Sequence, residues 1–178
     1  MKRKDRGLMH CAFAMMLISW TVVTILFLVQ FLRMERLKSY LEDCMTQAGL
    51  SALLIDPYAY GMSGEVVFAD VSEAEQLYLE YLRAALGSAE NQGRLGITGD
   101  VKVVQMIVYE KTADGILAHE RKEDSGWVSI LYGGTETVCA PDGTQIVSAA
   151  IYARIRMTVR VWGGVTVEIE RQHCVDIV

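Results

Sequence analysis

An uncharged run near the N-terminus limits the folds open to this chain more than any other feature. No residue from Gly7 to Leu32 is charged, and these 26 residues are mostly apolar. As a helix rising about 1.5 Å per residue they would measure roughly 39 Å, more than the ~30 Å hydrocarbon layer of a bilayer. A cleaved secretory signal has a shorter apolar region, and a buried core helix has an apolar stripe rather than apolar residues all around. We therefore predict a transmembrane helix over residues 7–32, with the lipid bilayer as its partner.

Charged residues on the two sides of this run predict its orientation. Four basic residues stand in the leader formed by residues 1–6, against three in residues 33–38. Loops rich in lysine and arginine stay in the cytoplasm. This bias favours a single-pass protein of the cell membrane whose N-terminus is cytoplasmic and whose C-terminal domain is extracytoplasmic.

The remainder of the chain is acidic. Residues 39–178 carry ten basic and twenty acidic side chains. A surface of this sign repels phosphate backbones, so we expect no nucleic-acid partner.

Beyond the membrane the apolar residues change to one stripe of a helix. They are Leu37, Leu41, Met45, Ala48, Ala52 and Ile55. This spacing predicts that residues 33–56 continue the transmembrane helix as a juxtamembrane extension, which Pro57 ends because the residue before proline is pushed out of the helical region.

Residues 57–178 are expected to form an α+β domain. Residues 66–69 favour a short strand. A helix is predicted after it, because Ser72 and Glu75 have capping-box spacing and residues 74–85 have a helical apolar stripe. This helix is expected to end at Gly87, a residue suited to a left-handed cap. The stretch 87–99 contains four glycines and is expected to be a loop. Runs rich in Val, Ile and Tyr predict strands at 101–110, 116–121, 127–132, 146–161 and 165–171. The predicted fold is one long helix and a second helix on an antiparallel sheet.

The last hairpin permits a prediction of register. A two-residue turn at Gly163 and Gly164 would place apolar residues opposite polar ones on one face. A three-residue loop, 162–164, with a glycine in the left-handed region avoids this. It pairs Val161 with Val165, Val159 with Val167, Met157 with Ile169 and Arg156 with Glu170. We expect the apolar face to meet the helices and the charged face to meet solvent.

Residue types that carry catalysis or bind metals are few. The three histidines are His10 in the predicted span, His119 in a probable strand, where a surface position is favoured, and His173. His173 and Cys174 are neighbours, which in a strand point to opposite faces and form no dyad. Glutamates 73, 75 and 80 are explained by helix start and solvation. We expect no catalytic residues, no metal site and no cofactor.

Three of the four cysteines lie beyond the span. Cys139 and Cys174 both fall in the sheet-rich half, and we expect a disulfide between them if the domain is outside the cytoplasm. Buried free thiols are the open alternative.

Three stretches together resemble TadE-like pseudopilins, minor components of the Tad or Flp branch of type IV pilus systems. Gly7, Leu8 and Phe13 match the family's processing region, although Ala12 stands where the family has a glutamate. Residues 41–56 are similar to the juxtamembrane helix of clostridial pilus-like proteins, and residues 151–155 with 174–178 are similar to the end of the same group. The resemblance implies a pilin-like fold and cleavage by a prepilin-type peptidase between Gly7 and Leu8.

The expected function is that of a non-enzymatic subunit of a Tad/Flp-type pilus or related secretion machine, which contacts other pilin-like or assembly-platform membrane proteins. Two alternatives remain open. One is a membrane-tethered ligand-binding or sensing domain, which a pocket lined by Trp127, Tyr132 and Tyr152 would favour. The other is a tethered hydrolase that uses a buried pair of carboxylates.

Overall fold

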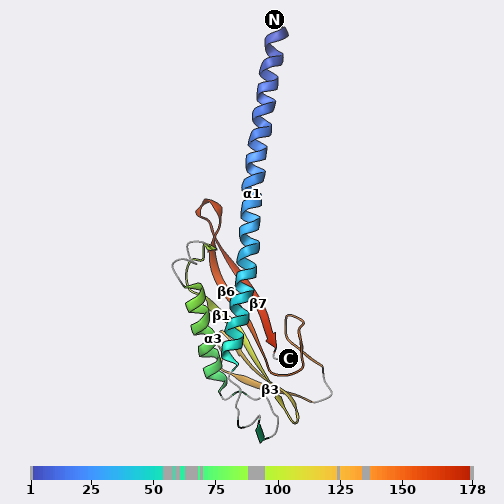
Figure 1. Ribbon diagram of the computed structural model, residues 1–178, viewed down its shortest axis with the longest axis vertical. Helices are drawn as coiled ribbons and strands as arrows, with labels where there is room; N and C mark the ends of the chain where they lie inside the picture. Colours follow the sequence, from blue (N-terminus) through green and yellow to red (C-terminus); the bar gives the residue numbers. More distant parts are fainter. Residues whose placement is uncertain are drawn as a thin grey trace. The chain divides into compact units, whose positions relative to one another are not determined.

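The computed structural model describes residues 2–53, 58, 61–62, 68, 70–87, 95–123, 125–133 and 137–176, with side chains for all of these except 2–8 and 162. The chain forms two compact units, Met1–Lys38 and Ser39–Val178. Helix α1 (Lys2–Ala52) passes through the first unit and continues into the second (Figure 1).

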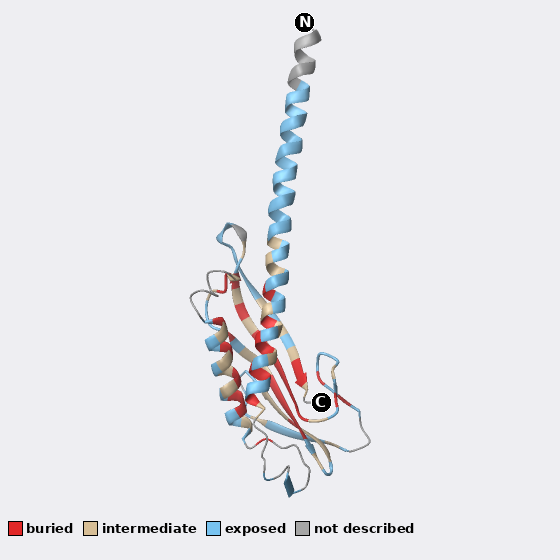
Figure 2. Ribbon diagram, viewed as in Figure 1, coloured by how far each residue is buried: buried red, intermediate tan, exposed pale blue. Residues whose placement is uncertain are grey.

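The first unit is a single apolar helix. Every side chain from Met9 to Val29 is exposed, and the large apolar ones range from 38% exposed at Leu26 to 77% at Met9. Figure 2 shows this stretch of α1 without a buried position. Among the described residues, α1 is the one helix long and apolar enough to cross a membrane.

The part of α1 within the second unit has the predicted buried stripe. Leu41, Met45, Ala48 and Ala52 are buried. The helix ends at Ala52, slightly before the predicted end, with Leu53 N–H donating to the Gly49 carbonyl at 3.1 Å. The proposed stop at Pro57 lies outside the described residues.

The second helix, α3 (Val71–Leu86), covers the predicted segment and is capped differently from the prediction. Asp70 is the N-cap, and its side chain accepts from the backbone N–H groups of Ser72 and Glu73. The capping box expected at Ser72 is therefore wrong, because the helix begins two residues earlier with Asp70 as its N-cap. Gly87 is also not left-handed: its φ of −81° is helical. Of the strand predicted at 66–69, only Phe68 is described.

A five-stranded antiparallel sheet in the order β3-β2-β1-β6-β7 forms the second unit with these helices. Its strands are β1 (Lys102–Thr112), β2 (Gly115–Lys122), β3 (Val128–Gly133), β6 (Ala150–Arg160) and β7 (Thr166–Asp176). The strand expected from 146 is divided: β4 (Val138–Cys139) pairs with β5 (Gln145–Ile146), and β6 begins only at Ala150. β7 ends five residues later than predicted. The α+β class is confirmed.

The predicted hairpin register is confirmed. Arg156 pairs with Glu170, Met157 with Ile169 and Val159 with Val167. A three-residue turn, η1 (Trp162–Gly164), joins the strands, with φ of 77° at Gly163 and 79° at Gly164. Glycine reaches these angles without steric strain, which is why this turn suits the sequence.

Hydrophobic residues are buried on both faces of the sheet. One face carries Met106, Val108, Ile151 and Ile155, all buried, and α1 and α3 contact this face (Figure 2). The opposite face has a second core beneath residues 137–149. Its buried members are Ile107, Tyr109, Ala118, Val138, Ala140, Ile146, Ala150, Tyr152 and Cys174. The expectation that this face meets only solvent is therefore wrong at the end near Tyr152, since the β4–β5 segment covers it.

Candidate functional site

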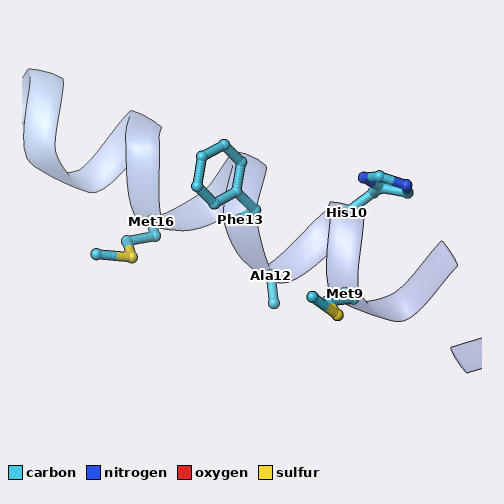
Figure 3. A pocket seen from close by; sticks show the side chains of 5 residues that line it. All are labelled: Met9, His10, Ala12, Phe13 and Met16. Carbon is cyan, nitrogen blue, oxygen red and sulfur yellow. The ribbon is translucent and has the colours of Figure 1, made fainter. Parts of the chain in front are cut away.

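The candidate processing positions lie in α1. Gly7 and Leu8 are part of its helical backbone, and the side chains of Ala12 and Phe13 are exposed. Figure 3 shows Phe13 and His10 extending to one side of the helix and the single methyl group of Ala12, with Met9, to the other; Met16 lies one turn farther along. All five side chains belong to one helix, so the hollow between them has no opposing wall and cannot enclose a ligand. It is an exposed, mostly apolar surface of one helix.

Helix α1 contacts β7 through one polar pair and one close backbone approach. Thr46 Oγ1 lies 2.9 Å from His173 Nε2. One turn later a Cβ added to Gly49 would stand 2.8 Å from Cγ2 of Val175, so only glycine fits there without displacement. His173 thus faces α1 while Cys174 enters the second core, which confirms that these neighbours point to opposite faces.

A row of polar side chains crosses β1, β2 and β3. Glu110, only 4% exposed, accepts from the Phe68 N–H at 2.8 Å and lies 3.2 Å from His119 Nε2. His119 Nδ1 lies 2.8 Å from Ser129 Oγ. The surface position expected for His119 is wrong: its side chain is 16% exposed because cross-strand pairing places Ser129 directly opposite it.

The order serine, histidine, carboxylate is also that of a hydrolytic triad. Ser129 lies in the edge strand β3, however, where backbone N–H groups point within the plane of the sheet. Donors in that direction are poorly placed to stabilise an oxyanion above the face. The row therefore suits a structural link between three strands and the segment at Phe68.

Glu75 of α3 forms a second partly buried polar link. Its carboxylate Oε2 accepts from Nη1 of Arg121 on β2. The Glu75 side chain is 11% exposed and that of Arg121 is 39% exposed. The solvated role expected for Glu75 is wrong, because α3 lies with this position toward the sheet.

Charged side chains gather on the β6–β7 face away from the helices. Arg156 lies 3.0 Å from Glu168, 3.5 Å from Glu123 and 2.7 Å from Glu170. The hydrogen bond to Glu170, with the neighbouring carboxylates, raises the pKa of Arg156. This guanidinium therefore stays charged at neutral pH.

The predicted disulfide is absent, and all four cysteines are free. Val138 and Ala140 point into the second core with Cys174, so the alternation of β4 leaves Cys139 exposed between them. Burial raises the pKa of the Cys174 thiol to about 12. The alternative of buried thiols holds for Cys44 and Cys174 but not for Cys139.

Within the described residues, no three or more His, Cys, Asp or Glu side chains are grouped to hold a metal ion. The three aromatic residues of the sensing alternative do not converge on an open site. Tyr152 is fully buried, and its hydroxyl donates to Gln172 Oε1 at 2.9 Å. Tyr132 packs against the second core. Trp127 is not part of that core.

Comparison of the chain with models of protein families, with curated proteins and with solved structures finds no match.

Proposed function

We propose that this chain is a non-enzymatic, membrane-anchored structural or assembly subunit, similar to a minor pseudopilin of a Tad/Flp-type pilus or related secretion machine. One observation carries the proposal. Helix α1 exposes apolar side chains all around from Met9 to Val29, while its last residues are buried in the folded domain. A helix of this kind serves as a bilayer anchor for the domain that follows it.

The proposed topology places the N-terminus in the cytoplasm and residues 39–178 outside. The excess of basic residues in 1–6 over 33–38 supports this orientation. The acidic domain and the exposed Arg156 cluster then face the extracytoplasmic space, where other subunits of the machine would contact them.

Ala12 gives the proposal a specific form. In the TadE-like pattern a glutamate at this position helps to place the helix in a filament, and here a methyl group replaces it. Contacts of this part of α1 with neighbouring pilin-like helices would then depend on apolar packing alone. We propose a subunit at the base or tip of the assembly rather than a repeated filament subunit.

An intact-mass measurement of the protein from its native membrane tests the processing step. A mass that lacks residues 1–7, with Leu8 as the new N-terminus, would support cleavage by a prepilin-type peptidase. The Gly7→Val variant should keep the full mass, because the peptidase requires a small residue before the cleaved bond, while Ser51→Ala in the exposed part of α1 should be processed as the parent chain is.

Crosslinking in the membrane tests the assembly role. A photoreactive residue at Phe13, which is 62% exposed, should capture another apolar helix of the machine. The same residue at Val147, which is 61% exposed in the domain, is the matched control. Capture of no membrane protein from Phe13, together with an intact leader, would leave a simple anchored domain and contradict the proposal.

The Glu110–His119–Ser129 row contains the residue types of a hydrolytic triad and so gives one second candidate to test, hydrolysis with Ser129 as nucleophile. A fluorophosphonate probe should then label Ser129 and lose that labelling in His119→Ala. If Ser129 is labelled no more than Ser125, another serine beside β3, hydrolysis is excluded as a function of this row.

A further inference from the structure

A small cavity lies at the outer edge of β7. Its volume is about 330 Å³, and it is lined by Glu42, Arg154, Glu170, Arg171 and Gln172. All five residues belong to the second unit, one from α1, one from β6 and three from β7. β7 is an edge strand of the sheet, so side chains from both of its faces can line one hollow.

The sheet face away from the helices supplies two hydrogen-bonding groups that point in opposite chemical senses. Arg154 of β6 stands directly opposite Gln172 of β7. The Tyr152 hydroxyl donates to Gln172 Oε1 at 2.9 Å, which leaves the amide NH₂ of Gln172 as a donor. Glu170 accepts both of its hydrogen bonds from Arg156 at one oxygen, Oε1. The lower wall of the cavity therefore offers a guanidinium and an amide as donors.

The face that meets α1 supplies the other wall. Arg171 lies two residues before His173, so both side chains point to the same face of β7. His173 contacts Thr46 of α1 at 2.9 Å, and Glu42 lies one helical turn before Thr46. Glu42 and Arg171 thus stand on facing elements at the cavity.

The two arginines of the cavity have no side-chain partner in the part of the chain that the structure describes. Neither Arg154 nor Arg171 forms an ion pair there, whereas the nearby Arg156 contacts three carboxylates. Nε of Arg171 is shielded from solvent and has no hydrogen-bond acceptor. A shielded donor without an acceptor is unfavourable, and an oxygen of a ligand would remove that cost. The shortage of partners is selective, because residues 39–178 carry twice as many acidic as basic side chains.

The charges around the cavity indicate the chemistry of its ligand. Guanidinium groups bind carboxylates through paired, charge-assisted hydrogen bonds. Glu42 adds a carboxylate on the α1 side, which attracts an ammonium group. A dianion such as phosphate would match the arginines but would be repelled by Glu42 and Glu170. A ligand with one carboxylate and one ammonium group matches all of them.

We propose that this cavity binds a free α-amino acid, with its carboxylate on Arg154 and Arg171 and its ammonium group on Glu42. An α-amino acid carries these two charges on neighbouring atoms, so both fit within one small hollow. The site is independent of membrane anchoring and adds ligand binding to the proposed structural role. Because Glu42 belongs to α1 and Arg171 to β7, the ligand would join the helix to the edge strand.

Calorimetric titration of the full-length protein in detergent micelles tests the ligand class. L-Alanine is the probe, because it carries both charges and only a methyl side chain. Alaninamide lacks the carboxylate, N-acetylalanine lacks the ammonium group, and inorganic phosphate tests for a general anion site. We expect saturable binding of L-alanine with a Kd on the order of 1 mM. The other three compounds should bind at least about tenfold more weakly, since each loses a charge-assisted contact or meets a like charge.

Substitutions test the assignment of each charge. Arg154→Gln and Arg171→Gln should each weaken L-alanine binding at least about tenfold. Arg160→Gln, at an exposed arginine outside the cavity, is the matched control and should leave binding unchanged. Glu42→Gln should weaken the binding of L-alanine but not that of N-acetylalanine, because only L-alanine brings an ammonium group. Urea unfolding of each variant establishes that it is folded.

Several results would overturn the proposal. One is no saturable binding of L-alanine up to on the order of 10 mM. Another is binding of N-acetylalanine, alaninamide or phosphate as tight as that of L-alanine, which would contradict the requirement for both charges. A third is L-alanine binding that persists in the double variant of Arg154→Gln and Arg171→Gln, which would place the ligand elsewhere. None of these results affects the crosslinking and mass measurements that test the assembly role.

Discussion

Arg156 donates to a single oxygen of Glu170, from Nε at 2.9 Å and from Nη2 at 2.7 Å, across the pairing of β6 with β7. The two side chains stand directly opposite each other in the register that the hairpin sequence predicts. Both are solvent-accessible, so the pair specifies alignment more than it stabilises the fold.

A double-mutant cycle with Arg156→Ala and Glu170→Ala should therefore give a small coupling free energy that falls further as salt is added. The measurement is urea unfolding in detergent at low and high ionic strength. Gly163→Val is the contrasting change, because the φ of 77° at this turn position strains a β-branched residue. A Gly163→Val variant that unfolds no more easily than the parent would contradict the role given to the three-residue turn.

The Glu75–Arg121 link predicts unequal costs for its two halves. Arg121→Ala leaves the nearly buried Glu75 carboxylate without its partner and should cost about 1–3 kcal/mol of unfolding free energy. Glu75→Ala should cost less, since the guanidinium of Arg121 is 39% exposed and regains water. The urea midpoints of Arg121→Ala and Glu75→Ala show which variant loses more stability, with Glu80→Ala on the same helix as the control. A larger loss for Glu75→Ala than for Arg121→Ala would contradict this prediction.

Gly49 should resist replacement although it lies in a helix. Alanine would gain about 1 kcal/mol of helix propensity, but its Cβ would press on Val175, and overpacking costs about 1–3 kcal/mol. We expect Gly49→Ala to lower the unfolding free energy and Val175→Ala to recover part of the loss in the double variant. Leu50→Ala, at a side chain that is 56% exposed, serves as the control. If the changes in unfolding free energy of the two single variants simply add in the double variant, the two side chains do not contact each other.

The exposed and buried thiols should react at different rates. In the Cys11→Ser background a water-soluble maleimide at pH 8 should modify Cys139 quickly and Cys174 slowly, because burial hides Cys174 and raises its pKa to about 12. Urea should make the two rates similar. A mass lower by two hydrogens under non-reducing conditions would instead reveal the disulfide between them.

Alkaline solution should destabilise the folded domain. Burial raises the pKa of Tyr109 and of Cys174 above the values these groups have in an unfolded chain. Their contribution is complete below the unfolded pKa, near pH 9–10, and is lost as pH rises toward the folded pKa. Unfolding free energy measured between pH 8 and 11 should fall, and Tyr109→Phe should make the fall less steep; an unchanged slope in that variant would exclude Tyr109 as a cause.

Local sequence patterns predicted several parts of this structure. The uncharged run from Gly7 to Leu32 indicated a long apolar helix because a helix needs only its own residues to satisfy its backbone. The stripe from Leu41 to Ala52 and the pairing of Met157 with Ile169 followed from the periods of a helix and a strand. The processing role of Gly7, Leu8, Ala12 and Phe13 stays a prediction.

Contacts between distant segments were decided only by the tertiary structure. Glu110 meets the backbone of Phe68, and Glu75 meets Arg121, because α3 lies on the sheet beside β2. Cys139 and Cys174 are near the same core yet point apart, since the β4–β5 segment folds over the sheet with Val138 and Ala140 inward. Periodicity tells which residues share a face of one element, but the sheet order and the placement of helices determine what that face meets.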